Sequence, residues 1–226
     1  MLDYFVLGYY MATEALTSGE LPALLKRQVS LNRLLTPVEM DLTTLMLDAK
    51  TTVPAELSFV ELFMEDIQAG KWKFSFRSRG VKAVYKLKRG IRGFALVEKD
   101  LVIGDVWCVV SRDGKPASHP DLETLGLTCG DREVYGFDML IDPTYRGKNL
   151  AVPLQRALQR TLKAEGFLKV YGAFYDDNLP ALWMHRMLKY KELPKRQVTR
   201  FFVFNRSEPA EQPSTPTKKK TIKQTT

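Results

Sequence analysis

The chain has 226 residues, 45% of them hydrophobic, and a net charge of +8. That length suffices for one well-packed domain with or without an extension. Two cysteines cannot form a disulfide framework, and with only two histidines they make a structural zinc site a poor explanation, so we predict no metal. No uncharged apolar segment approaches the ~20 residues of a membrane span, and no basic region precedes an apolar run as in a signal peptide. We therefore expect a soluble protein of a reducing, cytoplasmic compartment.

The first seventy residues contain four segments that we predict to be helical. Leu2 to Leu16 is strongly apolar and aromatic, which favours a buried helix or a strand followed by a helix. Glu20 to Leu34 is predicted to form the second helix. Thr36-Pro37-Val38-Glu39 combines a capping threonine, a proline and a glutamate three residues after the cap, which predicts a third helix to about Ala49. The fourth is expected from Pro54 to Gly70.

The positive charge is concentrated in the next segment. Residues 71–92 hold nine basic and no acidic residues. Lys71 to Lys88 alternates between apolar and polar residues around Ser78-Arg79-Gly80, which predicts a hairpin with one apolar and one basic face. The basic face is interpreted either as solvated charge or as a surface for nucleic acid or an acidic substrate. Solvated charge is favoured, because aromatic rings are not interleaved with the cations as base stacking requires.

A second hairpin and a long connection follow. Gly93 to Glu98 and Leu101 to Val110 are predicted to pair around a tight turn. Ser111 to Asp131 is a polar connection with one short helix at Asp121 to Leu125. Because long ordered loops often carry specificity, we expect this one to border an acceptor site. Its histidine, His119, is expected to be an exposed loop residue.

The central stretch runs from Glu133 to Gln159. Val134 to Ile141 is apolar and β-prone, and Asp142-Pro143-Thr144 ends this strand. From Asn149 onward, leucines at a four-residue spacing predict a helix. The turn before it, Tyr145 to Asn149, contains a glycine and two cations. The first amides of a helix have no partner within it and the helix dipole is positive there, so the turn predicts an anion site suited to phosphate.

The rest of the chain continues the pattern of strand and helix. Phe167 to Tyr175 is predicted to be a strand, Leu179 to Lys189 a helix capped by Asn178, and Val198 to Phe204 a final strand. From Ser207 the sequence has little to bury and four lysines, which is typical of a disordered basic tail.

Two of these segments resemble the signature sequences of the GNAT superfamily of N-acetyltransferases. Ile141-Asp142-Pro143 matches a strand end Val-x-Pro, and Arg146-Gly147-Lys148-Asn149-Leu150-Ala151 matches the loop Arg/Gln-x-x-Gly-x-Gly/Ala, with Asn149 at the central glycine. Downstream, NLPALWMHRMLKY resembles Asn-x-x-Ala-x-x-x-Tyr-x-x-x-Gly-Phe, with His185 at the tyrosine. The resemblance covers roughly residues 92–205.

The resemblance implies an α/β (α+β) fold with a mixed, mostly antiparallel central sheet flanked by helices. On this basis we divide the chain into a helical N-terminal part (1–70), an acyltransferase core (71–206) and a disordered basic tail (207–226). The implied activity moves an acetyl group from acetyl-CoA to an amine of a small molecule or protein, by direct attack in a ternary complex. The sequence identifies neither the acceptor nor the oligomeric state.

The resemblance also implies which residues hold the cofactor. They lie at the end of the central strand, in the loop and at the start of the later helix: Met139, Ile141, Arg146, Gly147, Lys148, Asn149, Leu150, Ala151 and Asn178. For Asn178, helix capping alone is the alternative explanation.

Such enzymes use a base on the strand before the loop, and an acid on the later helix. By simple alternation one face of that strand carries Glu133, Tyr135, Phe137 and Met139. Glu133 is the predicted base, because it alone of these accepts a proton at neutral pH. Asp138 falls on the opposite face unless a bulge re-aims it. His185 is the predicted acid. The structural alternatives are a solvated glutamate at a strand start and a packed helix histidine.

Two other functions stay open. A CoA-binding module without turnover is favoured by Asn149 and by His185 in place of tyrosine. A nucleic-acid-binding protein, the less favoured alternative, would use residues 71–92 and the tail.

Overall fold

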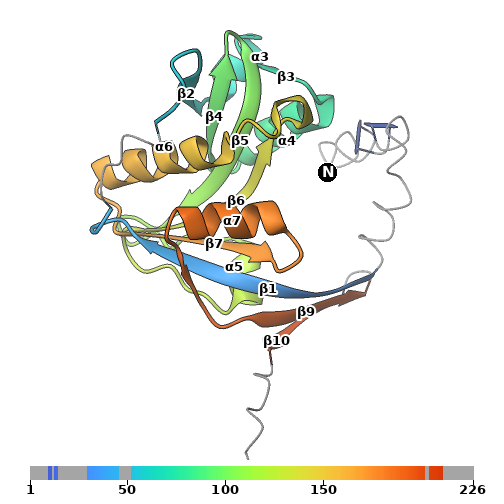
Figure 1. Cartoon of the computed structure of the whole chain (residues 1–226), viewed down its shortest axis with the longest axis vertical. Coiled ribbons are helices and arrows are strands. Elements are labelled where there is room, and N and C mark those ends of the chain that lie inside the picture. Colours follow the sequence, from blue (N-terminus) through green and yellow to red (C-terminus); the bar gives the residue numbers. More distant parts are fainter. Residues whose placement is uncertain (1–9, 12, 15–29, 46–51, 202–203, 211–226) are drawn as a thin grey trace, which may run out of the picture.

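The computed structural model describes residues 10–11, 13–14, 30–45, 52–201 and 204–210 of the chain (Figure 1). Its strands are β1 (Ser30–Asp41), β2 (Ser58–Leu62), β3 (Lys73–Phe74), β4 (Arg92–Glu98), β5 (Leu101–Val110), β6 (Glu133–Ile141), β7 (Lys169–Tyr175), β8 (Lys191–Glu192), β9 (Arg196–Phe201) and β10 (Phe204–Pro209). Its helices are α3 (Met64–Gln68), α4 (Arg77–Leu87), α5 (Pro120–Leu125), α6 (Ala151–Ala164) and α7 (Leu179–Met187), with a 3-10 turn, η2 (Pro143–Tyr145).

All the strands join one sheet in the order β10-β9-β1-β7-β6-β5-β4-β2, with β3 added to β5 and β8 to β1. The pairs β6–β7 and β3–β5 are parallel, and the other recorded pairs are antiparallel. The expectation of a mixed, mostly antiparallel sheet flanked by helices is therefore confirmed.

The N-terminal part is not wholly helical, and the third predicted helix is wrong. Residues 30–41 form β1, which lies inside the sheet between β7 and β9. The capping pattern at Thr36 misled because pairing on both sides outweighs local propensity: Leu35 faces Tyr175 of β7 and Arg196 of β9. Pro37 lacks an N–H and sits in the gap on the outer side, where the β9 ladder has stopped at Leu35 and the β8 ladder has not begun.

The other N-terminal predictions have mixed outcomes. The segment predicted as a helix from Pro54 to Gly70 contains β2, an edge strand on β4, and only the short helix α3. Most of the predicted helices at Leu2–Leu16 and Glu20–Leu34 lies outside the described residues. Residues 10, 11, 13 and 14 are helical, and residues 30–34 belong to β1.

The predicted basic hairpin at Lys71–Lys88 is also wrong. It consists of the two-residue strand β3 followed by the helix α4. The cations at Arg79, Lys82 and Lys86 are spaced by three and four residues, so they share one face of the helix, and carboxylates of the sheet lie opposite them. The spacing of these cations indicates a helix, but the alternation of apolar and polar residues in the same segment suggested strands instead.

The remaining predictions for the second half of the chain are confirmed in outline. They are the β4–β5 hairpin, the short helix α5, the strand–turn–helix of β6, η2 and α6, the strand β7 and the helix α7. The final strand differs, because the chain turns back after β9 and forms β10. Since β10 ends at Pro209, the folded part extends three residues into the predicted tail.

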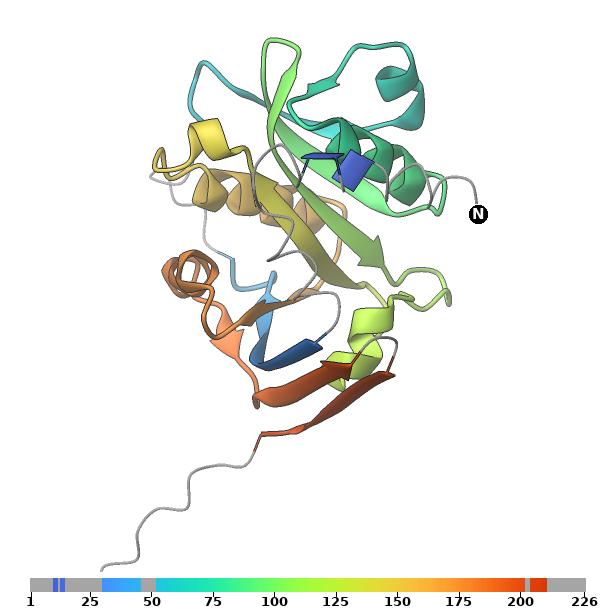
Figure 2. The same ribbon diagram turned by 90° about the vertical axis from the view of Figure 1, so that its right-hand side faces the viewer.

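The helices cover the two faces of the sheet unequally (Figure 2). On one face α6 and α7 enclose the largest core, in which Leu154, Leu158 and Leu162 are fully buried. On the other face α4 packs over Trp107, and α5 packs over Tyr135. The two faces are named below by these helices, the α6 face and the α4–α5 face.

Candidate functional site

The loop between β6 and α6 is anchored at both ends. Asp142 is buried, and its carboxylate accepts hydrogen bonds from the backbone N–H (2.9 Å) and hydroxyl (2.6 Å) of Thr144. The hydroxyl of Tyr145 donates to Glu98 at 2.7 Å. At the far end Leu150 is buried in the core beneath α6. The residues between these anchors are therefore positioned by the anchored ends of the loop, and Nζ of Lys148 also lies 4.6 Å from the ring centroid of Tyr145.

Between the anchors the backbone turns through two left-handed residues. Gly147 has φ +83° with open space around it, and Asn149 has φ 55°. Asparagine is one of the few side chains that tolerate this conformation, so it replaces the glycine of the resembled motif without losing the turn. Arg146, Lys148 and Asn149 are all exposed. The loop thus presents two cations and bare backbone to solvent.

The start of α6 fits an anion. Leu150 is its cap residue, and no side chain caps the helix, so Asn149 does not compete with a ligand there. The first amides of α6 have no partner inside the helix and lie at the positive end of its dipole. Pro153 removes one of these donors, which leaves those nearest Ala151. A phosphate group would be bound by these amides with Arg146 and Lys148 beside it.

β6 carries a bulge that changes which face its residues occupy. The register with β5 shifts between Asp105 and Trp107, and Asp138 in the bulge has φ 49°. Phe137 and Asp138 both lie on the α4–α5 face, whereas Met139 and Ile141 pack into the core on the α6 face. The alternation that placed Met139 on the face of Glu133 is therefore wrong. Met139 and Ile141 instead share the face of α6, on the approach to the loop.

β6 and β7 pair over only a short length. Their parallel ladder covers Glu133 to Tyr135 and stops, although both strands continue. Glycines follow on each strand at the point of separation, Gly136 on β6 and Gly172 on β7. A Cβ built on Gly172 would lie 3.7 Å from the carbonyl oxygen of Gly136 and 3.7 Å from Nε2 of His185. The carbonyl oxygen of Gly136 and Nε2 of His185 therefore both lie close to Gly172, where β6 and β7 separate.

His185 reaches this point from α7. Its side chain is 8% exposed, stacks on Phe174 with ring centroids 5.2 Å apart, and meets the edge of Tyr190. Nδ1 lies 2.7 Å from the carbonyl oxygen of Ala181. Burial lowers the pKa of His185 below its ordinary 6.5, although that bond and the charge of Glu192 favour the imidazolium. His185 is packed, as one alternative expected, and also placed at the separation of the strands.

The structure does not bring Glu133 close to the loop. Glu133 begins β6 and Ile141 ends it, so eight strand steps of about 3.3 Å separate them, roughly 26 Å. The carboxylate of Glu133 accepts the N–H of Gly130 at 2.7 Å and lies 3.7 Å from Nζ of Lys169. These contacts fix the turn before β6 and the start of β7, and the role of Glu133 as a base stays a prediction.

Asn178 has a structural role in the described chain. Its side-chain oxygen accepts the N–H of Ala181 at 3.3 Å, which caps α7. Helix capping, the alternative explanation for Asn178, is therefore confirmed, and its contact with a cofactor stays a prediction.

A buried charged cluster lies on the α4–α5 face, behind the bulge. Arg79 donates to both oxygens of Asp105 and, at 2.9 Å, to Asp138, while Lys86 contacts Asp138 from two turns further along α4. Burial alone would raise the pKa of Asp138, but Arg79, Lys86 and Lys82 outweigh it and hold that pKa well below its usual range. Burial lowers the pKa of Lys86 to about 7, and the carboxylate of Asp138 only partly offsets this.

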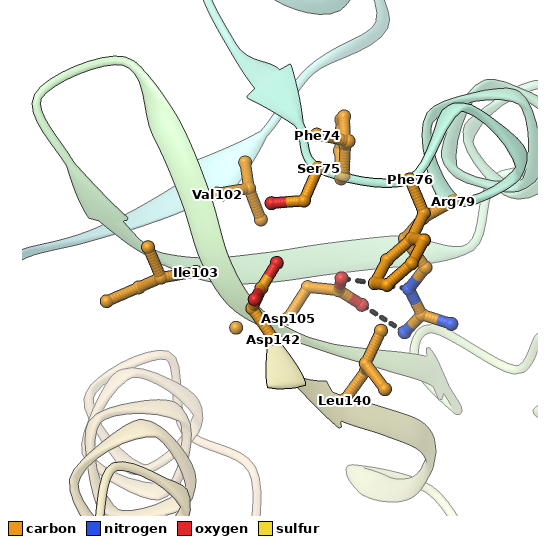
Figure 3. Close-up of a pocket in the computed structure, with 10 residues that line it drawn as sticks. Phe74, Ser75, Phe76, Arg79, Val102, Ile103, Asp105, Leu140 and Asp142 are labelled. Atoms are coloured by element: carbon orange, nitrogen blue, oxygen red, sulfur yellow. Dashed lines mark hydrogen bonds and ion pairs between the residues drawn. The ribbon is translucent and has the colours of Figure 1, made fainter. Parts of the chain in front are cut away.

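A small pocket adjoins this cluster at the C-terminal end of β6 (Figure 3). Its polar lining comes from Ser75, Arg79, Asp105 and Asp142, and Figure 3 shows Arg79 turned onto Asp105. Gly104 in its wall permits close packing, since a Cβ there would lie 2.6 Å from Ile141. The pocket and the loop therefore adjoin the same strand end, and Asp142 belongs to both.

His119 is not the exposed loop residue that the sequence suggested. Its ring packs on Phe137 with centroids 4.1 Å apart, and its Nδ1 accepts the N–H of Asp121 at 3.2 Å. Burial lowers the pKa of His119, and Asp121 opposes this. The connection containing α5 therefore covers the strand next to the bulge.

The nine cations of residues 71–92 are mostly engaged with the protein itself. Six of them hold carboxylates of this chain: Lys71, Lys73, Arg79, Lys82, Lys86 and Arg92. Two more stack on tyrosines, Arg77 on Tyr10 and Arg89 on Tyr85. The interpretation as wholly solvated charge is therefore incomplete, and little of this charge is left for an outside polyanion.

No group of histidine, cysteine, aspartate or glutamate among the described residues is arranged to hold a metal ion. No helix in the described part of the chain is long and apolar enough to cross a membrane.

Comparison with known proteins gives likeness in structure alone. No protein-family model and no curated protein sequence matches the chain. A tandem GNAT protein from the clavulanic acid biosynthesis pathway superposes with TM-score 0.51 at 15% identity, over 84% of this chain and 59% of its own. The GCN5-related glucosamine N-acetyltransferase region of a fungal multi-domain β-N-acetylglucosaminidase superposes with TM-score 0.56 at 13% identity, over 82% of this chain and 23% of its own. This chain thus spans less than two thirds of either protein.

Proposed function

The chain has the fold of the GNAT acetyltransferases, and we propose that it transfers an acetyl group from acetyl-CoA to an amine. The observation that carries the proposal is the uncapped start of α6, which lies behind the exposed residues Arg146 and Lys148. In this fold that loop has the residue types and backbone shape of a phosphate cradle, and the resembled motif assigns it the same task.

The chain's residues divide the work of binding between loop and strand. Amides near Ala151, with the cations of the loop, would hold the diphosphate of the coenzyme. Met139 and Ile141 lie on the face of β6 that leads from the loop toward the separation of β6 and β7. There the unpaired strand backbone offers hydrogen bonds to an extended amide-containing chain. These assignments follow the predicted cofactor residues except Asn178, for which capping suffices.

Bound acetyl-CoA would supply a thioester, whose carbonyl carbon an amine attacks. The protein then has to place the amine, accept its proton and shield the reacting atoms from water. The acceptor would approach from the α4–α5 face, which the bulge and the connection around α5 border, and its amine would reach the thioester through the separation of β6 and β7.

A CoA-binding module without turnover is the second candidate. The observation that favours it is the engagement of both predicted catalytic side chains in structural contacts, Glu133 with Gly130 and His185 with Ala181. The nucleic-acid alternative loses support, because most of the basic residues in 71–92 already hold groups of the protein.

The proposal is tested by measuring free thiol released from acetyl-CoA in the presence of a panel of amines and lysine peptides. We expect release that depends on an acceptor, and a mass increase of one acetyl group on that acceptor. Arg146→Glu should lower kcat/KM for acetyl-CoA at least tenfold, whereas Arg132→Glu, the same charge change at the other end of β6, should not. Binding without release across the panel would favour the module. Absence of binding would refute the proposal.

A further inference from the structure

His185 is fixed in one tautomer by the helix that carries it. The carbonyl oxygen of Ala181 can only accept a hydrogen bond, so Nδ1 at 2.7 Å must carry the proton. In the neutral ring, Nε2 then carries a lone pair and no proton, so it can accept a hydrogen bond but cannot donate one. Within the described part of the chain Nε2 has no hydrogen-bond partner.

Nε2 is directed at the place where β6 and β7 separate. It lies 3.7 Å from the position of a Cβ on Gly172, so a glycine there leaves bare backbone in front of the nitrogen. Stacking on Phe174 and the edge contact with Tyr190 hold the ring in this orientation. The lone pair of Nε2 therefore points to the separation of β6 and β7. The face of β6 that carries Met139 leads to the same place.

The surroundings favour the neutral ring. Gly172 and Phe174 of β7, which lie against His185, are uncharged, as is Val38 of β1 beside Gly172. The ionisable groups that face it are the phenol of Tyr190 and the carboxylate of Glu192. Burial outweighs Glu192, so the pKa lies below 6.5 and the imidazolium is a minor form at neutral pH.

We propose that Nε2 of His185 first accepts the proton of the attacking amine, so that His185 enters the reaction as a base rather than as the proton donor that its position in the motif suggested. This rests on the proposed function. The amine nitrogen forms a bond to the thioester carbonyl carbon, the carbon–sulfur bond breaks with its electron pair on sulfur, and the proton of the amine moves to Nε2. The resulting imidazolium returns that proton to the thiolate, which restores the starting tautomer.

The first test uses the free protein and needs no activity. The chain has only two histidines, so nitrogen-15 NMR of the imidazoles resolves each one. We expect the Nδ1–H tautomer for His185 and the opposite Nε2–H tautomer for His119, whose Nδ1 accepts the N–H of Asp121. His185 should titrate below 6.5. A protonated Nε2 at pH 7, or titration above 7, would overturn the proposal.

The second test uses enzyme activity to distinguish a proton-accepting His185 from a proton-donating one. His185→Gln should lower kcat by about 10²-fold or more, and the fall in rate toward acid pH seen in the unaltered protein should disappear. His185→Tyr keeps a proton at neutral pH and should be impaired as strongly. If His185→Tyr instead kept most of the activity, or if the unaltered protein lost rate as the pH rose past the pKa of His185, the donor role would hold.

Two controls keep this outcome distinct from failure of the proposed function. Calorimetric titration should show unchanged affinity for CoA in both His185 variants, and Arg132→Glu should keep the full rate. Loss of CoA binding in the unaltered protein would count against the proposed function itself. Retained binding and full activity in His185→Gln would count against the role of His185 alone.

Discussion

Replacing Asp138 by asparagine should destabilise the protein strongly, although the volume of the side chain hardly changes. Asp138 holds Arg79, Lys82 and Lys86 of α4, and Lys86 is almost entirely buried. Asparagine tolerates left-handed backbone as aspartate does, so the φ of 49° is preserved. The substitution therefore removes the charge and leaves the shape and the bulge in place.

The expected magnitude follows from the burial of the partners. Removing one member of a buried ion pair costs about 3–5 kcal/mol, because the remaining charge is left without compensation. Part of that loss would be recovered, because the side chain of Asp138 is 26% exposed, Arg79 keeps its bonds to Asp105, and Lys86, whose pKa is already about 7, can lose its proton. We therefore expect the free energy of unfolding to fall by about 2–4 kcal/mol at pH 7.

Urea denaturation of both proteins measures this difference, with the midpoint falling and the slope unchanged. The matched control is Asp66→Asn, which breaks an exposed pair with Lys71 and should cost about 0–1 kcal/mol. If Asp138→Asn cost no more than this control, the cluster would not be the buried electrostatic anchor of α4 described above.

Two further predictions concern packing and the chain end. Gly93→Ala would place a Cβ 2.5 Å from the ring of Trp107, so it should lower the free energy of unfolding by about 1–3 kcal/mol. Gly136→Ala meets nothing closer than 3.6 Å and should lower it less. Equal losses of stability in the two variants would contradict the packing argument. Deleting residues 211–226 should leave the melting temperature and CoA affinity unchanged because the segment has little to bury, whereas deletion from 204 removes β10 and should lower the melting temperature.

The part of the fold that the sequence predicts well is the part in which local and tertiary signals agree. The strand β6, the turn after it and the leucine stripe of α6 each have a local pattern that packing reinforces. At Thr36 the local pattern favoured a helix, yet pairing with β7 and β9 made a strand. At α4 two periodicities coexist in the sequence, and the ion pairs of Arg79 and Lys86 with the sheet decided between them.

The site was predictable where it is contiguous and unpredictable where it depends on geometry between elements. Residues 146–151 come from one loop, so the motif alone places them together, and their contact with a coenzyme stays a prediction. The bulge at Asp138 is a one-residue insertion in β6 relative to β5, and no residue type in the sequence indicates it. It places Met139 on the α6 face instead of the face of Glu133. The acceptor character of His185 depends on a hydrogen bond and a glycine from another strand, which only the folded chain brings together.

Calorimetric titration of acetyl-CoA into the full chain tests the central claim most directly. The account predicts one binding site per chain and at least a tenfold loss of affinity, about 1.4 kcal/mol, in Arg146→Glu, because a carboxylate there would repel the diphosphate. Arg132→Glu should bind as the unaltered protein does. No binding at millimolar acetyl-CoA, or equal affinity in Arg146→Glu, would contradict the assignment of the α6 loop as the coenzyme site.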